Sequence, residues 1–370
     1  MYLEKDLVAI AKRENNQKRN YLVVNRLQGK HIAVSPKQTL AMFSELGEQI
    51  QKKYHTEKLL LIGFAETATA IGAALAVQLD SYYIQTTREQ VPGAEYFYFT
   101  ESHSHATEQK LVKNELEQII SLVDRIIFVE DEVTTGNTIY KIIQLLRQQY
   151  GLKLRFSVAS LLNGMNRDSE EFYKKEGIET LYLVKTNHEI YSEAARLYEG
   201  NGRYYKEGMA YNLKVEKIKI HAEYANARKI VSGKGYAYAC KKLYEEVLRH
   251  ILFHGRESVL VLGTEEFMYP PLYVAWRLEQ MGMDVRFHAT TRSPIEVSLE
   301  DEYPLHDRYE LISFYDENRK TFVYDLKKYD KVLIFTDAGK EAQKAEKTLL
   351  HALEITGNQE VYVIDWRSGH

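Results

Sequence analysis

The sequence has little cysteine, little proline and no long apolar run. Its one cysteine, Cys240, can form neither an internal disulfide nor a zinc site built from several thiolates. There are 6 prolines, and no stretch approaches the ~18 consecutive apolar residues of a membrane-spanning helix. The first 20 residues are charged and lack the apolar core of a signal peptide. These absences predict a cytoplasmic protein with no membrane partner.

Neither sign of charge is in excess. Lysine and arginine number 49 against 52 aspartates and glutamates, so the formal net charge is −3. Proteins that coat nucleic acid usually carry a basic excess, and we therefore expect no nucleic-acid partner. At roughly 100–200 residues per domain, the 370 residues predict two domains, each able to bury its own core. The 28 tyrosines against 13 phenylalanines suit half-buried faces and interfaces.

Short apolar runs alternate with amphipathic stretches in the first half of the chain. Two short strands within 20–36 and a helix at about 38–54 come first. The pattern then predicts buried strands at 59–63, 81–87, 125–130, 155–162 and 180–185, and helices at about 67–79, 137–151 and 169–177. Apolar strands that alternate with helices predict an α/β fold with a parallel sheet flanked by helices.

A second α/β block follows a Tyr-rich connector, in which Lys and Glu alternate at 213–219 as in a solvated edge strand. Its predicted elements are helices at about 237–253, 270–281 and 340–354 and strands at 258–263, 284–291, 331–336 and 360–366. We therefore expect a domain at 1–228 and a second at 229–370. The first would comprise a hood at about 20–36, a core at about 38–185 and the connector at about 186–228.

The two blocks share polar residues at matching places. The matches are Gly63 and Glu66 with Gly263 and Glu266, Thr86-Thr87-Arg88 with Thr290-Thr291-Arg292, and Asp131 with Asp337. Three matches in the same order, at the same strand ends, indicate an internal duplication. The alternative is that any two open α/β sheets share the succession of strand, glycine and helix. The second domain would then be a degenerate copy of the first.

The most informative segment follows the strand at 125–130. That strand ends in the acidic pair Glu130-Asp131, and a Thr/Gly loop then opens a helix. The loop residues are Thr134, Thr135, Gly136, Asn137 and Thr138. Amides and hydroxyls of such a loop, with the positive end of the helix, form a cradle for phosphate. Acidic residues beside it suit sugar hydroxyls or a divalent cation.

This segment resembles the motif of type I phosphoribosyltransferases that binds 5-phosphoribosyl-1-pyrophosphate (PRPP). The resemblance implies that Glu130 and Asp131 grip the ribose hydroxyls and, with substrate, Mg²⁺, while Thr134–Thr138 holds the 5′-phosphate. It also implies a pyrophosphate loop after the strand at 59–63, where the residues are Gly63, Phe64, Ala65, Glu66 and Thr67. Arg88 is a candidate partner of the pyrophosphate, with a surface salt bridge as the alternative.

Residues 91–110 fall where that family places a flexible lid over PRPP. The lid candidates are Glu101, His103, His105 and Lys110. The histidines could be catalytic, contact pyrophosphate or chelate a metal, and a plain solvated loop is the alternative. Base recognition is expected from 20–36, with Lys30 and His31, and from 161–164.

Nearly the whole chain resembles orotate phosphoribosyltransferase-like proteins fused to a C-terminal TRSP domain. That domain is named after a motif present here as Thr291-Arg292-Ser293-Pro294. The resemblance implies a homodimer and an association with tellurium-resistance and stress gene clusters. It also implies a PRPP-dependent enzyme that makes a ribosylated small molecule from an unidentified base, with Mg²⁺ as cofactor.

The second block keeps polar residues but has lost the phosphate loop. The candidates there are Glu265, Glu266, Arg292, Ser293 and Asp337. They could form a second small-molecule site, contribute to the first in an internal pseudo-dimer, or serve structure alone. For the whole chain, the alternative to an enzyme is a non-catalytic sensor or regulator that binds PRPP or a nucleotide on the same fold.

Overall fold

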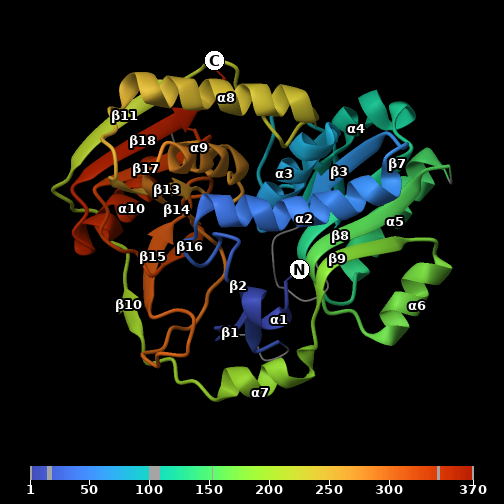
Figure 1. Ribbon diagram of the computed structural model, residues 1–370, viewed down its shortest axis with the longest axis horizontal. Helices are drawn as coiled ribbons and strands as arrows, with labels where there is room; N and C mark the ends of the chain where they lie inside the picture. The colour runs from blue at the N-terminus through green and yellow to red at the C-terminus, as the bar shows by residue number, and fades with distance from the viewer. Residues whose placement is uncertain (1, 15–18, 100–108, 152, 340–341, 369–370) are drawn as a thin grey trace. The chain divides into compact units, whose positions relative to one another are not determined.

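The computed structural model describes residues 2–14, 19–99, 109–151, 153–339 and 342–368. The chain divides into two compact units, and neither is continuous in sequence. Unit 1 is Met1–Tyr2, Leu40–Thr186 and Ala225–Tyr238; unit 2 is Leu3–Thr39, Asn187–Tyr224 and Ala239–His370. Figure 1 gives the labels of the elements along the chain.

These units differ from the expected domains 1–228 and 229–370. The expected hood at 20–36 counts with unit 2, because Val34 forms an antiparallel bridge with Phe287. Conversely, the segment just before the second block belongs to unit 1, because Val231 and Ser232 pair with Tyr83 and Tyr82. The segment that precedes each block therefore pairs with a strand of the other block.

Unit 1 contains a six-stranded sheet. Its strand order is β12 (Val231–Ser232), β4 (Tyr82–Gln85), β3 (Leu59–Gly63), β7 (Arg125–Val133), β8 (Arg155–Asn163) and β9 (Glu179–Lys185). Neighbouring strands run parallel except for β12. The unit also holds α3 (Thr69–Leu79), α4 (Lys113–Ile119), η1 (Ile120–Leu122), α5 (Asn137–Tyr150), α6 (Arg167–Lys175) and the hairpin β5 (Tyr96–Phe99) with β6 (Gln109–Val112).

Unit 2 contains a five-stranded parallel sheet. Its order is β11 (Lys214–Ile220), β18 (Glu360–Trp366), β17 (Lys331–Thr336), β13 (Ser258–Gly263) and β14 (Asp284–Ala289). Two small sheets accompany it, β1 (Val8–Lys12) with β2 (Tyr21–Asn25), and β10 (Arg203–Tyr205) with β15 (Asp307–Ile312) and β16 (Lys320–Tyr324). The remaining helices are α1 (Glu4–Leu7), η2 (His188–Ile190), α7 (Tyr191–Arg196), α9 (Tyr269–Gln280) and α10 (Gln343–Ile355). Two helices, α2 (Pro36–Tyr54) and α8 (Gly233–His250), contain residues of both units.

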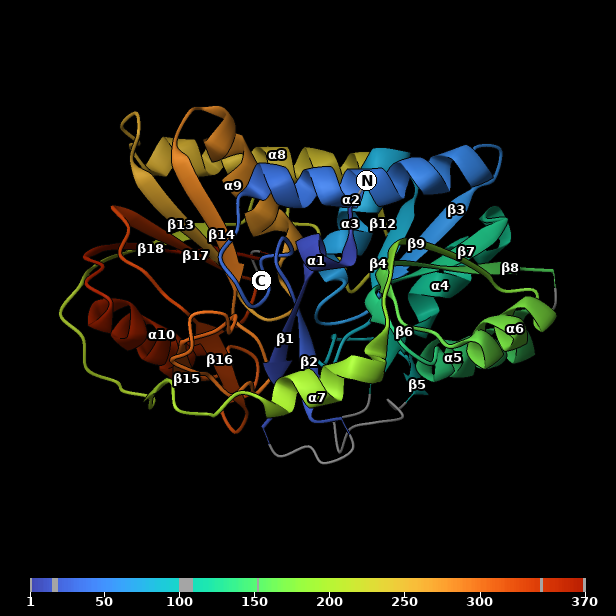
Figure 2. The ribbon, with the colours of Figure 1, turned by 60° about the horizontal axis from the view of Figure 1, so that its bottom comes forward.

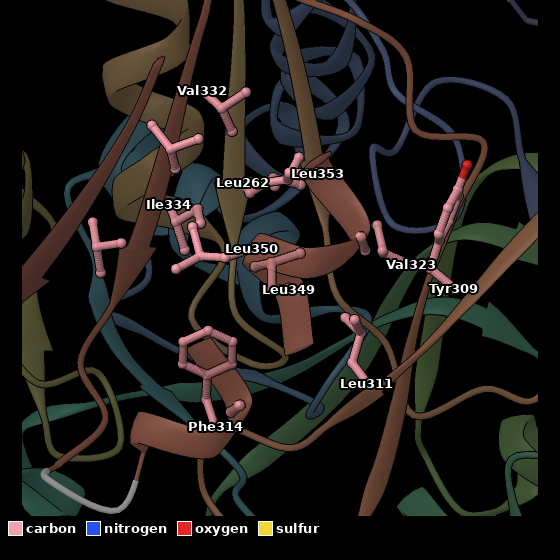
Figure 3. Packing of buried hydrophobic residues seen from close by; sticks show 14 of the residues in the cluster. Leu262, Tyr309, Leu311, Phe314, Val323, Val332, Ile334, Leu349, Leu350 and Leu353 are labelled. Carbon is pink, nitrogen blue, oxygen red and sulfur yellow. The ribbon is translucent and has the colours of Figure 1, made fainter. Parts of the chain in front are cut away.

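The core of unit 2 explains why its central strands β13 and β17 are largely apolar. Figure 3 shows Leu349, Leu350 and Leu353 of α10 against Leu262 and Ile334 of the sheet. The intervening strand residues, which point to the other face, are buried too. Figure 2 shows α9 on the opposite side of this sheet from α10. A parallel sheet covered on both faces buries both faces of its central strands, at about 1.5–3 kcal/mol for each large apolar side chain.

The two parallel sheets have the same internal order. Strands β4-β3-β7-β8 of unit 1 match β14-β13-β17-β18 of unit 2, and an edge strand, β9 or β11, follows in each. The hairpin β5–β6 also has a counterpart in β15–β16. Each hairpin joins its block by an antiparallel bridge, Thr87 with Lys110 and Thr291 with Phe322. The structure thus supports the predicted second α/β domain as an altered copy of the first.

The predicted strands and helices of both blocks are present, with ends shifted by a few residues. The prediction of two strands within 20–36 was wrong, because β2 ends at Asn25 and pairs with β1, which lies earlier at Val8–Lys12. The expected edge strand at 213–219 is confirmed as β11, at the end of its sheet.

Candidate functional site

The site is built at the carboxyl edge of β3 and β7. These strands are parallel neighbours, with Gly63 opposite Val129, so the segments that follow them leave the same edge of the sheet. The amide of Phe64 donates to the carbonyl of Val129 at 3.1 Å. Farther out, the hydroxyl of Thr67 donates to Oδ1 of Asp131 at 3.0 Å. The structure therefore joins the predicted pyrophosphate loop to the predicted acidic pair.

The acidic residues belong to β7 itself, which continues to Val133. Glu130 and Glu132 share one face of the strand, and Asp131 points to the other. Burial, and next the charge of Glu132, raise the pKa of Asp131 to about 6. Glu132 was not predicted as part of this group, although its place directly after the acidic pair was visible in the sequence. A carboxylate with a raised pKa is suited to a cation or hydroxyl donor that stabilises its charge.

Within the predicted phosphate loop, Gly136 caps α5, so Asn137 and Thr138 lie in the first turn of the helix. Gly136 has φ +72°, in the left-handed region that favours glycine. A Cβ there would lie 2.2 Å from the hydroxyl oxygen of Tyr173 and 2.6 Å from Cε of Met165. The hydroxyl of Tyr173 donates to the carbonyl of Gly136 at 2.7 Å. The first amides of α5 have no partner within the helix, so this end can bind an oxyanion.

Tyr173 and Met165 were not predicted as neighbours of this loop. Tyr173 lies on α6, and Met165 follows β8, which is the strand next to β7. The amphipathic pattern at 169–177 predicted the helix, and its one buried residue is Tyr173. Asn163 and Gly164, expected in base recognition, lie at the same edge. Gly164 donates to the carbonyl of Val133 at 2.8 Å, and the Asn163 side chain accepts from the Met165 amide at 2.9 Å.

The loop after β3 is closely packed. A Cβ on Gly63 would lie 2.7 Å from the hydroxyl oxygen of Tyr83 and 3.0 Å from the carbonyl oxygen of Ala68. The peptide between Ala65 and Glu66 is cis. Glu66 is buried, and its carbonyl accepts from the hydroxyl of Thr69 at 3.0 Å, in the first turn of α3. The local geometry therefore depends on a glycine at the end of the strand.

Arg88 lies in the segment after β4, the strand on the other side of β3. Thr87 exchanges two backbone hydrogen bonds with Lys110, at 2.8 and 2.9 Å. The Lys110 ammonium lies 3.4 Å from the carbonyl oxygen of Arg88 and 5.5 Å from the ring centre of Tyr96. Lys110 is thus tied to the Arg88 segment. The other lid candidates, Glu101, His103 and His105, lie outside the described residues.

The matching loop in unit 2 is organised around a carboxylate of the chain itself. Glu265 is fully buried, and its Oε2 lies 2.8 Å from Nε of Arg292 and 3.0 Å from a terminal nitrogen of Arg319. Its Oε1 accepts from the hydroxyl of Ser313 at 2.6 Å and from the amide of Phe314 at 3.1 Å. Arg292, predicted as a candidate for a second site, therefore has Glu265 as an ion-pair partner. Arg319 and Ser313 were missed because no motif marks them.

The other unit 2 candidates also contact the chain. Glu266 lies 3.8 Å from Arg292. The carbonyl of Ser293 accepts from Tyr324 at 2.7 Å, and Asp337 accepts from the hydroxyl of Tyr315 at 2.6 Å. Each of these contacts connects elements within unit 2, which is what a structural role requires.

Lys30 was expected in base recognition at the first block. It is fully buried, and its ammonium donates to the carbonyls of Glu265 and Thr290 at 3.0 and 2.9 Å. The reason is the antiparallel bridge at Val34, which places this segment beside β14 of unit 2. Within unit 2, the Lys30 ammonium thus stabilises the backbone of the loop that contains Glu265.

Among the described residues, no group of three or more His, Cys, Asp or Glu side chains is placed to hold a metal ion. No helix in the described part of the chain is long and apolar enough to cross a membrane. Cys240 is buried as a free thiol.

Family models match both regions of the chain. Residues 7–187 match a family described as phosphoribosyl transferase. Residues 232–353 match the TRSP domain that lies C-terminal to it. The chain belongs to the phosphoribosyl transferase family with a C-terminal TRSP domain. The comparison with curated proteins gave no match.

Solved phosphoribosyltransferases resemble the chain over about half its length. The adenine phosphoribosyltransferase of Rhodothermus marinus is 14% identical, with a TM-score of 0.36, over 49% of this chain and 96% of that one. The orotate phosphoribosyltransferase of Aeropyrum pernix is 16% identical, with a TM-score of 0.33, over 52% and 95%.

Proposed function

We propose that this protein transfers the 5-phosphoribosyl group of PRPP to a nitrogenous base or similar small acceptor and releases pyrophosphate. The observation that carries the proposal is the contact between Thr67 and Asp131. It joins a glycine loop and an acidic strand end at one sheet edge, beside a helix that Gly136 caps. Together these features match what the 5′-phosphate, the pyrophosphate and the ribose of PRPP require.

Each part of the site has a role in this proposal. The first turn of α5 and the hydroxyls of Thr134–Thr138 hold the 5′-phosphate. Glu130 and Asp131 accept hydrogen bonds from the 2′- and 3′-hydroxyls and hold the sugar in place. The loop Gly63–Thr67 faces the pyrophosphate, and Arg88 adds a bidentate partner.

Mg²⁺ is the cofactor that this chemistry implies. Among the described residues, no three carboxylate or imidazole side chains are placed to hold a metal ion. Mg²⁺ commonly takes one or two carboxylates together with substrate phosphates and water. The raised pKa of Asp131, which burial and the Glu132 charge cause, fits a carboxylate that meets a cation. When bound with substrate, Mg²⁺ would neutralise the leaving pyrophosphate.

The bond changes are simple in this reaction. The bond between C1 of the ribose and the pyrophosphate oxygen breaks, the acceptor nitrogen bonds to C1, and the proton on that nitrogen goes to solvent. Positive charge develops on the ribose ring in the transition state. In this proposal, the carboxylates of Glu130 and Asp131 stabilise that charge by electrostatic attraction. A dedicated strong base is not needed when the acceptor nitrogen is already acidic.

The test is to incubate the protein with PRPP, Mg²⁺ and a panel of purine, pyrimidine and related bases, and to measure pyrophosphate release. We expect release that depends on one class of base and on Mg²⁺. Tight PRPP binding without release for any base would instead support a sensor or regulator. Absence of both binding and release would overturn the proposal.

A further inference from the structure

The backbone of Ala65 is held on both sides by two side chains from distant segments. Its amide donates to Oγ1 of Thr86 at 2.8 Å. Its carbonyl accepts from Nε2 of Gln109 at 3.2 Å. The two side chains are also bonded to each other, since the Thr86 hydroxyl donates to Oε1 of Gln109 at 2.8 Å. Ala65, Thr86 and Gln109 therefore form a closed ring of three hydrogen bonds.

This ring is shielded from water. Thr86 is 0% exposed and Gln109 2% exposed. Buried backbone groups need partners, and here both polar groups of Ala65 find one. The amide of Thr86 also donates to the carbonyl of Gly63 at 2.9 Å, so the same threonine binds the loop at two points. The ring thus limits how the loop Gly63–Thr67 can turn its peptide groups.

The corresponding loop of unit 2 satisfies the same backbone groups in another way. The Glu265 amide donates to the hydroxyl of Thr290 at 3.0 Å, as the Ala65 amide does to Thr86. The Glu265 carbonyl, however, accepts from the ammonium of Lys30. By the matching bridges of Lys110 and Phe322, Gln109 corresponds to Thr321. The threonine is therefore common to both blocks, and the glutamine belongs to the first.

We propose that Gln109, acting with Thr86, is a positioning residue that orients the loop Gly63–Thr67 to receive pyrophosphate. The inference rests on the proposed function, because it assigns the pyrophosphate to this loop. Gln109 touches the loop backbone and acts through it. The side-chain amide of Gln109 is neutral, so it fixes the loop without adding a charge beside the charged substrate and Mg²⁺.

The experiment measures two ligands on the full chain, with Mg²⁺ present, by titration calorimetry. Pyrophosphate reports the loop Gly63–Thr67, and ribose 5-phosphate reports the 5′-phosphate cradle at α5. Gln109→Met keeps the size of the side chain and removes both hydrogen bonds. We expect pyrophosphate affinity to fall about tenfold, as the loss of a buried hydrogen bond predicts, and ribose 5-phosphate affinity to stay within about twofold.

A second pair of variants tests the same ring if Gln109→Met fails to fold. Thr86→Val removes the hydroxyl at almost constant volume, whereas Thr86→Ser keeps it. We expect Thr86→Val to lose pyrophosphate affinity like Gln109→Met, and Thr86→Ser to recover it. The matched control is Thr290→Val, which removes the corresponding hydroxyl in unit 2 and should leave pyrophosphate affinity unchanged.

The outcomes separate this inference from the proposed function. Wild-type binding of pyrophosphate that Gln109→Met and Thr86→Val leave unchanged would overturn the positioning role alone. Equal losses for pyrophosphate and ribose 5-phosphate would indicate general damage to the unit and would overturn it as well. A wild-type protein that binds neither ligand nor PRPP would overturn the proposed function and this role with it.

Discussion

The loops after β3 and β13 both begin with a glycine at the end of the strand. The carboxylates that contact these two loops have different partners. In unit 1, Thr67 of the loop after β3 donates a hydrogen bond to Asp131 of β7, and the pKa of Asp131 is raised by burial and a neighbouring carboxylate. In unit 2, the buried Glu265 lies against Arg292 and Arg319. A carboxylate with two guanidinium partners is compensated by the chain itself, whereas the raised pKa of Asp131 means that its surroundings disfavour the charged form. The difference favours ligand chemistry in unit 1 and structure in unit 2.

The segments that follow β7 and β17 also differ in their polar contacts. Gly136 caps α5 with a left-handed φ and receives the Tyr173 hydroxyl on its carbonyl. In unit 2, Asp337 follows β17 and accepts from two tyrosine hydroxyls, those of Tyr315 and Tyr224. The glycine cap of the proposed 5′-phosphate loop therefore has an acidic side chain with tyrosine partners in the matching region of unit 2.

The largest effect should come from removing the compensated charge in unit 2. Glu265→Ala leaves two arginines and Ser313 around a buried gap, and we expect the free energy of unfolding to fall by about 3–5 kcal/mol. Both tryptophans, Trp276 and Trp366, lie in unit 2, so their fluorescence in a urea titration follows this unit. A loss below about 1 kcal/mol would contradict the structural role of Glu265.

Glu66→Ala is the matched variant in the other block. We expect it to change pyrophosphate release more than the tryptophan-detected transition, because Glu66 lies in the proposed pyrophosphate loop of unit 1. If Glu265→Ala and Glu66→Ala both changed mainly stability, or both changed mainly pyrophosphate release, the contrast between the two loops would be wrong.

The sequence predicted the parallel strands and their helices well, for a physical reason. Strands such as Leu59–Gly63 are buried on both faces and therefore read as continuous apolar runs. The hairpins β5–β6 and β15–β16 were missed. Tyr96–Phe99 is half-buried and aromatic, and its partner begins ten residues after it ends, so no short turn signal links the two strands.

The candidate site was predicted only in its local parts. The acidic pair and the Gly136 loop are contiguous in sequence, so their residue types indicated their chemistry. The partners that shape them come from far along the chain: Tyr173 is 37 residues from Gly136, and Gln109 is 44 from Ala65. Lys30 was expected at the first block, and the pairing of its segment with β14 of unit 2 is a contact that no local pattern reveals.

The second largest effect concerns turnover. Asp131→Asn keeps a hydrogen-bond acceptor for Thr67 and removes the negative charge near the developing positive charge of the ribose. We expect pyrophosphate release to fall about 100-fold, the scale of a lost electrostatic contact to a transition state. Asp337→Asn is the matched variant in unit 2 and should keep turnover within about threefold. Equal losses in both variants would contradict the assignment of the chemistry to unit 1.

The same aspartate should also make stability depend on pH. Its pKa is about 6 in the folded protein against 3.8 for an ordinary aspartate. Between these values the folded state keeps a proton that the unfolded state has released, so the free energy of unfolding falls as pH rises from about 4 to 6. Allowing for partial exposure, we expect a fall of about 2 kcal/mol.

The measurement is urea unfolding followed by circular dichroism at pH 4.0, 5.0, 6.0 and 7.0, for wild type and Asp131→Asn. The difference between the two proteins isolates this group from the other carboxylates, and Asp337→Asn should follow wild type. Parallel curves for wild type and Asp131→Asn would mean that the folded protein does not raise this pKa.

The smallest effect should come from Tyr173→Phe. It removes the hydroxyl that donates to Gly136 and keeps the buried ring, so the loop loses one hydrogen bond worth about 1 kcal/mol. Because the affected carbonyl caps α5, we expect ribose 5-phosphate to bind a few-fold more weakly while pyrophosphate binding stays unchanged. This is the reverse of the result expected for Gln109→Met. If Tyr173→Phe weakened pyrophosphate alone, the two anion positions assigned to unit 1 would have to be exchanged.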